Sequence, residues 1–249
     1  MLSDIDIRKL AMKSGVPAGV VEKDYVITKF LYHLRGVEKD LVFKGGTAIK
    51  KAYIEWMRFS EDLDFISLKK SGWERGLGRI FKDIDMGMKT KDVAKFRLSR
   101  TITISFVGPL GYKNSFKLDF SMREKPLLKP QDRNIVHFYP DIPKFSFPVL
   151  ALDEILAEKL RALYTRGKAR DVLDVFYLSN LRFSRNTVKR IFAEKLKTLQ
   201  VYSIDESRFR NTVKDFNMEE IMYLMPPKPS INRENVIKSV LKGYAFLFR

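Results

Sequence analysis

A glycine pair between a predicted strand and a predicted helix constrains the fold of this chain more than any other feature. Residues 41–44 are a short apolar run of the kind that forms a buried strand, and Gly45 and Gly46 follow directly. A helix is predicted over residues 47–56, with Thr47 as its N-cap. Glycines at a strand-to-helix junction let backbone N–H groups approach a phosphate. The order therefore predicts an α/β core with a phosphate-binding turn.

Two aspartates follow on the next predicted strand. Residues 62–68 alternate as a strand, which places Asp62 and Asp64 on one face with Cα atoms roughly 6–7 Å apart. Like charges on one face repel unless a cation lies between them, and hard oxygen donors suit Mg²⁺. Asp119, on the polar face of a strand predicted over 115–122, is a candidate third ligand. The alternative is a pair of solvated aspartates at a strand end beside a tight glycine turn.

The remaining patterns divide the chain into an α/β half over residues 1–148 and a helical half over 149–249. The first half combines strands and helices and the second shows apolar stripes at helical spacing. We expect an α+β protein, with a mixed sheet flanked by helices and followed by a C-terminal helical bundle. Further predicted elements are helices over 1–40, 73–97, 186–199, 205–216 and 232–247, and strands over 98–108 and 135–139.

A second group of charged residues lies in the helical half. Lys159 follows Ile155 by four positions, so its side chain projects near an apolar stripe and needs a partner or a ligand. Gly167 lets the next helix fold back, which brings either Asp171 or Asp174 towards Lys159. One interpretation is a salt bridge between two helices. The other is that Lys159 contacts triphosphate oxygens while Asp174 orients Lys159 or the acceptor.

The net charge of +17 favours a polyanionic partner such as nucleic acid or a nucleotide. Residues 159–197 hold 11 Lys and Arg against 3 acids, a net charge of +8, and form a candidate track for a phosphate backbone. A solvated helical face is the alternative interpretation of this block. A weak helix-turn-helix pattern over residues 11–24 also fits nucleic-acid binding.

Composition excludes several other chemistries. The chain has no cysteine and only two histidines, which excludes disulfides, thiolate zinc sites, cysteine nucleophiles and histidine-rich metal sites. No apolar run reaches the roughly 18 residues of a membrane helix, and the first residues do not have the pattern of a secretory signal. We therefore expect a cytoplasmic protein without a membrane partner.

At these residues the chain resembles the AbiEii-type nucleotidyltransferases, the toxins of type IV toxin–antitoxin and abortive-infection systems. This family lies within the DNA polymerase β-like nucleotidyltransferase superfamily. The resemblance spans residues 20 to 180 and rests on four segments: VEKDYVITKFL, FKGGTAIKKAY, RFSEDLDF and EILAEKLRALYTRGKARDVLDVFYL. It implies a nucleotidyltransferase core with an appended helical domain.

The resemblance also implies roles for particular residues, in which an acidic pair holds the metal and a later Lys–Asp pair completes the catalytic set. Asp119 fits the position of the superfamily's third acid, and Asp171 competes with Asp174 for the later acidic position. The catalytic residues would be Asp62, Asp64, Lys159 and Asp174, the metal ligands Asp62, Asp64 and Asp119, and the nucleotide-binding residues Gly45, Gly46, Thr47, Ser60 and Lys159.

Members of such a family transfer a nucleotide from an NTP to an acceptor. The resemblance implies Mg²⁺ as cofactor, an RNA acceptor such as the 3′ end of tRNA, and an antitoxin as the partner in a two-gene system. A competing hypothesis is a nucleic-acid-binding module with an inactive nucleotidyltransferase core, although the intact acids and Lys159 argue against it. A transferase acting on a small cationic acceptor is a weaker alternative, because the basic block disfavours such a substrate.

Overall fold

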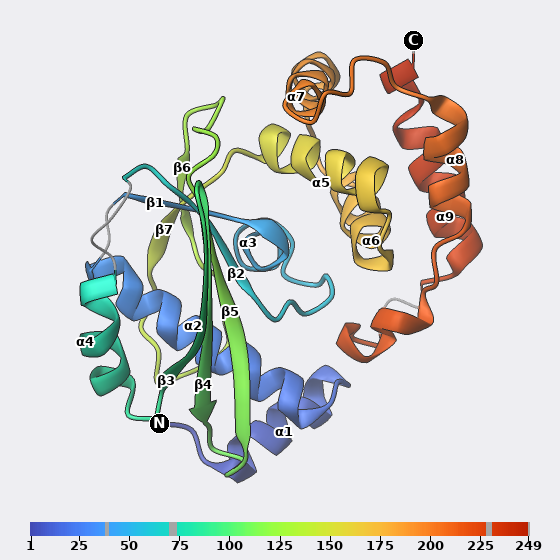
Figure 1. The fold of residues 1–249 in the computed structure, drawn as a ribbon. Coiled ribbons are helices and arrows are strands. Elements are labelled where there is room, and N and C mark those ends of the chain that lie inside the picture. The colour runs from blue at the N-terminus through green and yellow to red at the C-terminus, as the bar shows by residue number, and fades with distance from the viewer. Residues whose placement is uncertain (38–39, 70–73, 228–230, 249) are drawn as a thin grey trace. The chain divides into compact units, whose positions relative to one another are not determined.

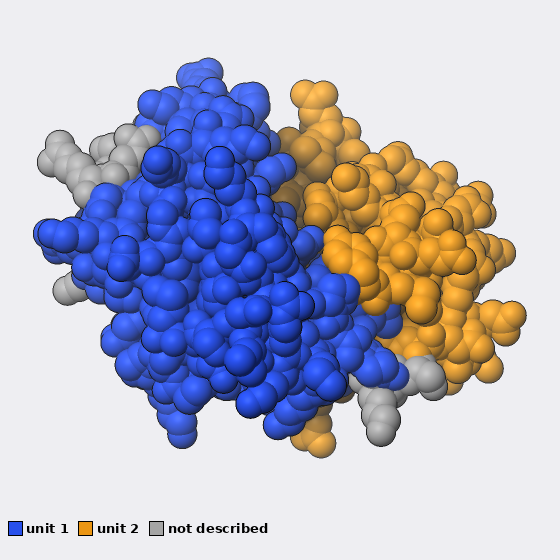
Figure 2. Space-filling model, turned by 90° about the horizontal axis from the view of Figure 1, so that it is seen from below, with its two compact units in different colours: residues 1–126, 130–150, 224–227 blue, residues 127–129, 151–223, 228–249 orange. Residues whose placement is uncertain are grey.

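The computed structural model describes residues 1–37, 40–69, 74–227 and 231–248. The chain divides into two compact units, which Figure 2 shows in blue and orange. We call them the sheet unit and the helical unit. The sheet unit comprises residues 1–126, 130–150 and 224–227, and the helical unit comprises residues 127–129, 151–223 and 228–249.

A mixed sheet forms the centre of the sheet unit, as expected. Within the described residues it has seven strands, in the order β3-β4-β5-β2-β1-β7-β6. The pairs β2–β5 and β1–β7 are parallel and the other neighbours are antiparallel. The strands are β1 (Leu41–Lys44), β2 (Leu63–Ser67), β3 (Lys89–Phe96), β4 (Ser99–Val107), β5 (Lys113–Ser121), β6 (Gln131–Asn134) and β7 (Ser146–Val149).

The alternation predicted for the strand at 115–122 is confirmed. Phe116, Leu118 and Phe120 are each at most 2% exposed, so one face of β5 lies in the core. The helix α2 (Ala18–Val37) packs on this face, and the rings of Phe30 and Phe116 meet edge to face at 5.4 Å. Aromatic contacts of this kind add to the burial of apolar area. The polar side chains of β5 therefore lie on its opposite face.

In the part of the chain that the structure describes, four helices accompany the sheet, and their arrangement can be followed in Figure 1. They are α1 (Asp4–Ser14), α2 (Ala18–Val37), α3 (Gly45–Ala52) and α4 (Glu74–Ile84). Gly15, with φ +67°, ends α1 in the left-handed conformation that glycine adopts without strain. The first half of α2 is buried, including Val21, Glu22 and Asp24. A DNA-reading helix needs this N-terminal half exposed, so the helix-turn-helix interpretation is wrong.

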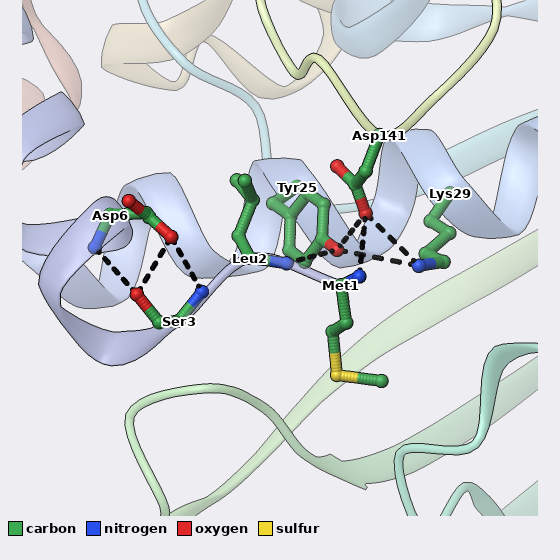
Figure 3. Close-up of polar contacts among 7 residues, drawn as sticks. All are labelled: Met1, Leu2, Ser3, Asp6, Tyr25, Lys29 and Asp141. Atoms are coloured by element: carbon green, nitrogen blue, oxygen red, sulfur yellow. Dashed lines mark hydrogen bonds and ion pairs between the residues drawn. The ribbon is translucent and has the colours of Figure 1, made fainter.

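A polar cluster fixes the start of the chain to the sheet unit (Figure 3). The carboxylate of Asp141 accepts a hydrogen bond of 2.6 Å from the Tyr25 hydroxyl and one of 3.2 Å from Lys29 Nζ. The N-terminal ammonium of Met1 lies 3.6 Å from the same carboxylate oxygen. Although burial opposes it, these hydrogen bonds lower the pKa of Asp141. The cluster joins α2 to the segment before β7.

Within the described residues, the helical unit contains five α-helices and two segments with 3₁₀ geometry. Leu156, Leu160 and Val172 are fully buried in its core, as the apolar stripes predict. The segments are α5 (Leu152–Arg166), α6 (Ala169–Leu178), α7 (Arg185–Lys197), α8 (Glu206–Lys214), η1 (Glu219–Leu224), α9 (Arg233–Gly243) and η2 (Ala245–Phe248). Of the helices that the structure describes, none combines the length and the hydropathy required to cross a membrane.

Two predicted elements of the first half are wrong. The helix predicted over 73–97 ends at Ile84, because a turn with positive φ at Asp85 and Gly87 stops it, and β3 follows; residue 73 itself lies outside the described part of the chain. The strand predicted over 135–139 does not form. Its first two N–H groups bond to carbonyls of different segments, Phe145 and Lys51, so no ladder continues.

Candidate active site

The aspartate pair lies at the start of β2. Asp64 belongs to the strand and Asp62 immediately precedes it. Leu63 and Phe65 are fully buried, whereas both aspartates are half-buried. Successive side chains on a strand point to opposite faces, so the two carboxylates share the face away from the core. The backbone N–H of Lys117 donates to a carboxylate oxygen of Asp62 at 3.3 Å.

The sheet register adds two neighbours to Asp64. Its Cα pairs with Asp119 on the parallel strand β5 and with Lys44 on the antiparallel strand β1. Residues paired in register point to the same face, and neighbouring strands lie about 4.8 Å apart. Asp64 therefore has an acid on one side and a base on the other. The register supports the expectation that Asp119 lies beside the aspartate pair.

Asp119 is held by a residue that sequence reasoning missed. Thr101 on β4 pairs in register with Asp119, and its hydroxyl donates a hydrogen bond to the Asp119 carboxylate. A threonine in a β-branched strand is common, so the sequence carries no signal for this contact. Thr101 extends the row of polar side chains across β4, β5, β2 and β1. The contact fixes one oxygen of Asp119.

The glycine pair is packed directly against the acids. Gly45 has φ +79°, and a Cβ added there would overlap the Asp64 carboxylate. A Cβ on Gly46 would lie 2.9 Å from Ser60 Oγ and 3.1 Å from Arg58 Nη2. Only a residue without a side chain fits either position without displacing its neighbours. The turn, Ser60 and Asp64 are thus brought together, as expected from the sequence.

The helix after the turn begins earlier than predicted. It starts at Gly45, so Lys44 is the N-cap and the expected capping role of Thr47 is wrong. Thr47 is fully buried, and its hydroxyl donates to the backbone carbonyl of Asp62. This bond ties α3 to the residue before β2. The helix N-terminus at Gly45 and Gly46 presents backbone N–H groups, which attract anions.

A buried guanidinium supports this turn. Arg58 is 3% exposed and donates from Nη1 to the carbonyl of Phe59 at 2.9 Å. The sequence marks Arg58 only as part of the motif around Ser60, and its burial behind Gly46 is visible only in the structure. Charge behind a phosphate-binding turn strengthens its positive potential.

Charged residues of α2 fix the segments around the site. Lys23 Nζ lies 2.8 Å from a carboxylate oxygen of Glu61. Lys51 Nζ lies 2.9 Å from a carboxylate oxygen of Asp24, and both side chains are almost fully buried. The Tyr139 hydroxyl donates to Asp24 at 2.7 Å. A buried ion pair with such added hydrogen bonds fixes the position of α3 against α2.

In the helical unit, Asp174 rather than Asp171 faces Lys159. Lys159 Nζ lies 2.7 Å from a carboxylate oxygen of Asp174, which is fully buried, whereas the lysine side chain is 12% exposed. Asp171 accepts two hydrogen bonds, of 2.8 and 2.7 Å, from the guanidinium of Arg166. The salt bridge between helices is therefore present. A role of Lys159 in binding nucleotide remains a prediction.

The basic block is less uniform than its sequence indicates. Lys195 is 1% exposed and lies 3.1 Å from carboxylates of both Glu154 and Glu158, so it serves the core of the helical unit. Lys159 is engaged with Asp174 in the same way. The block's most exposed bases are Arg166, Lys168, Arg182, Arg185, Arg190 and Lys197. These six side chains are the exposed part of the block.

The aspartates fit a cation site whose remaining ligands come from the substrate and water. Across the described ranges, no group of three or more Asp, Glu, His or Cys side chains is arranged to hold a metal ion. Mg²⁺ commonly takes one or two carboxylates, with waters and substrate phosphates as its other ligands. Asp62 and Asp64, beside a turn that fits phosphate, match that donor set. Asp119 as a third ligand remains a prediction.

The fold is that of the nucleotidyltransferase toxins. The nucleotidyltransferase toxin MenT4 of Mycobacterium tuberculosis has a TM-score of 0.75 at 20% identity, covering 100% of this chain and 90% of that one. JHP933 of Helicobacter pylori has a TM-score of 0.62 at 19% identity, covering 93% of each chain. At these identities the likeness concerns the fold alone. A comparison with curated proteins finds no match.

The family is shown by the sequence. The model of the family described as "Nucleotidyl transferase AbiEii toxin, Type IV TA system" matches residues 29–220, which is more than half of the chain. The chain therefore belongs to the AbiEii family of nucleotidyltransferase toxins. It is a nucleotidyltransferase, and the interpretation as an inactive binding module is not supported.

Proposed function

We propose that this protein transfers a nucleotide from an NTP to an RNA hydroxyl, the 3′ end of tRNA, with Mg²⁺ held by Asp62 and Asp64. One observation carries the proposal. The Gly45 backbone is packed so closely against Asp64 that no side chain fits between them. A turn that binds phosphate and an acid that binds a cation are therefore in contact, as transfer at a nucleotide phosphorus requires.

The proposed reaction is a displacement at the α-phosphorus. The acceptor hydroxyl gives its proton to solvent water and its oxygen forms a bond to the α-phosphorus, while the bond from that phosphorus to the β-phosphate oxygen breaks and pyrophosphate leaves. The backbone N–H groups of Gly45 and Gly46 bind phosphate oxygens. Asp62 and Asp64 would hold Mg²⁺, which would supply neutralisation of triphosphate charge and greater acidity of the attacking hydroxyl.

The other candidate residues take supporting roles. Lys159 binds triphosphate oxygens as a point charge, and its ion pair with Asp174 keeps the ammonium in one orientation. Asp119, held by Thr101, is the third acid. Ser60 lies beside Gly46 and completes the wall of the phosphate-binding turn. Thr47 acts through its buried bond to the Asp62 carbonyl, which fixes the aspartate pair relative to α3.

The RNA acceptor is supported by charge. The net charge is +17, and the exposed bases of α5 and α7 and of the segments that join them to α6 offer contacts to a phosphate backbone. Such contacts are independent of base sequence, so recognition of a tRNA rests on shape and on its single-stranded 3′ end. Transfer to that end would block aminoacylation and stop growth. An antitoxin in the same system is the proposed functional partner.

The experiment is transfer of label to RNA. The protein is incubated with each α-³²P-labelled NTP, Mg²⁺ and total RNA, in parallel with Asp64→Ala. We expect label on a tRNA-sized band with the wild type and none with the variant. tRNA whose 3′ diol has been oxidised by periodate is the matched acceptor control and should take no label. Label on the protein alone would contradict the RNA acceptor, and label on oxidised tRNA would contradict the 3′ end.

A further inference from the structure

A lysine that the catalytic scheme does not use lies in the core behind the active site. Lys50, on α3, is 8% exposed. Its ammonium donates hydrogen bonds to the carbonyls of Glu55 at 2.9 Å and Met57 at 3.2 Å. It also lies 4.2 Å from the centre of the Phe59 ring, in a cation–π contact. Burying an ammonium is costly, so its position calls for an explanation.

These contacts converge on one segment. Residues 53–60 connect the end of α3 to the approach of β2, and we call them the connecting loop. Two of its carbonyls and one of its rings face Lys50, as the distances above show. The Phe59 N–H donates to the carbonyl of Leu224 at 2.7 Å, which holds the same loop from another direction. These polar contacts, together with the burial of Ile54, Met57 and Phe59, hold the loop in place.

The connecting loop ends at the candidate active site. Ser60 and Arg58 are the two residues that contact the position of a Cβ on Gly46. Asp62 follows two residues after the loop, and Glu61 between them is paired with Lys23. A displacement of the loop would move the wall of the phosphate-binding turn and the first acid together.

We propose that Lys50 is a positioning residue for nucleotidyl transfer, which holds the connecting loop so that Ser60, Arg58 and Asp62 keep their places at the Gly45–Gly46 turn. The inference rests on the proposed function. Lys50 acts through the loop and does not touch the nucleotide. A displacement of about 1 Å in a positioning element can cost roughly 100-fold in rate, so the effect should appear in kcat.

The charge of Lys50 is itself sensitive to pH. Burial lowers the pKa of Lys50 to about 8. The nearby acids Asp24 and Glu55 raise this pKa, whereas the nearby bases Lys51 and Arg58 lower it further. Above that pH the neutral amine binds the two carbonyls and the Phe59 ring more weakly. The hold on the loop should therefore weaken as pH rises through about 8.

Three variants test the proposal. Lys50→Met removes the ammonium, Lys50→Arg keeps a cation that does not titrate in this range, and Lys29→Met is the control. Lys29 is also a largely covered lysine of the sheet unit, 14% exposed, and pairs with Asp141 instead. We expect Lys50→Met to lower kcat 10- to 100-fold with a smaller change in KM for NTP. Lys29→Met should keep wild-type kcat, and Lys50→Arg should restore most of the activity.

Two further measurements separate positioning from stability. Hydrogen exchange of the Phe59 amide should be at least about 10-fold faster in folded Lys50→Met than in Lys29→Met. In the wild type, kcat should fall as pH rises through about 8, and this fall should be smaller in Lys50→Arg. The comparison tests the proposal even if Lys50→Met does not fold. The proposal would be overturned if Lys50→Met had the kcat and the Phe59 amide exchange of the wild type. It would also be overturned if kcat of Lys50→Arg fell at high pH as much as that of the wild type. A wild type without any transfer activity would instead contradict the proposed function, and exchange at Phe59 would still test the hold on the loop.

Discussion

Lys159 and Asp174 form an ion pair with 2.7 Å between the lysine Nζ and a carboxylate oxygen. Asp174 is fully buried in the helical unit, whereas the lysine side chain retains 12% exposure. The buried carboxylate has a fixed position and the lysine keeps access to water. An ammonium held in this way can bind a phosphate while its partner keeps it oriented.

The ion pair should have separable effects on stability and activity. Lys159→Met removes the ion pair to the buried carboxylate of Asp174, and we expect a loss of about 3–5 kcal/mol in the free energy of unfolding. The double variant Lys159→Met/Asp174→Leu removes both charges and should recover most of that stability. Transfer activity should stay lost in both, because the lysine is absent. Urea denaturation and transfer assays measure the two effects, and an active double variant would show that the pair is structural only.

Gly45 should not tolerate a side chain. Gly45→Ala places a Cβ at φ +79° and against the Asp64 carboxylate, so we expect a loss of about 1–3 kcal/mol in stability together with loss of transfer. Gly78→Ala is the matched control. It lies in α4, and a Cβ there meets nothing within 4 Å, so the protein should be unchanged or slightly more stable. Equal stability of the two variants would contradict the close packing at Gly45.

The acids should make stability depend on Mg²⁺ and nucleotide. A ligand that binds only the folded state raises the melting temperature. At 100 times its Kd, such a ligand adds about 2.7 kcal/mol to the free energy of unfolding. We expect Mg²⁺ with NTP to raise the Tm of the wild type. Asp64→Asn should fold, because it removes one of two neighbouring like charges, and should lose this shift. Differential scanning fluorimetry measures this rise in Tm. A rise in Asp64→Asn as large as in the wild type would exclude Asp64 from the binding site.

Glu22 gives a prediction on pH that does not involve the active site. Burial raises the pKa of Glu22, whose carboxylate accepts the Leu110 N–H at 2.7 Å. Because the folded state holds the proton more tightly than the unfolded chain, Glu22 lowers stability as pH rises above the ordinary carboxyl pKa of 4.5. Glu22→Gln keeps an acceptor for Leu110 without the charge.

The advantage of Glu22→Gln over the wild type should therefore be larger at pH 7 than at pH 4. Urea denaturation at both pH values measures the difference. A difference that shrinks as pH rises would contradict the buried, proton-retaining carboxyl.

The sequence predicts the parts of the site that depend on short spacing. Gly45, Gly46 and the aspartate pair lie within 20 residues, and strand alternation is enough to place both carboxylates on one face. The register of Asp64 with Asp119 joins segments 55 residues apart, and only the assembled sheet fixes it. Thr101 meets Asp119 through the pairing of β4 with β5. The partners of Lys50 are only five and seven residues away, but they lie on an irregular loop whose path the local pattern does not reveal.

The errors in the fold also have local causes. Residues 73–97 are polar with scattered apolar positions, a pattern shared by a surface helix and by the exposed edge strand β3. The turn at Asp85 and Gly87 separates the two, and an aspartate with positive φ is not evident from sequence. Residues 135–139 are strand-like in composition, but their N–H groups bond to two different segments.

The most direct test compares two positions of the label. The protein is incubated with Mg²⁺, tRNA and one NTP that is labelled with ³²P at either the α- or the γ-phosphate, and Asp64→Asn is assayed in parallel. Nucleotidyl transfer predicts that tRNA takes label from the α-phosphate only, that label from the γ-phosphate is released as pyrophosphate, and that the variant does neither. Label from the γ-phosphate on the RNA, or transfer that persists in Asp64→Asn, would contradict the account.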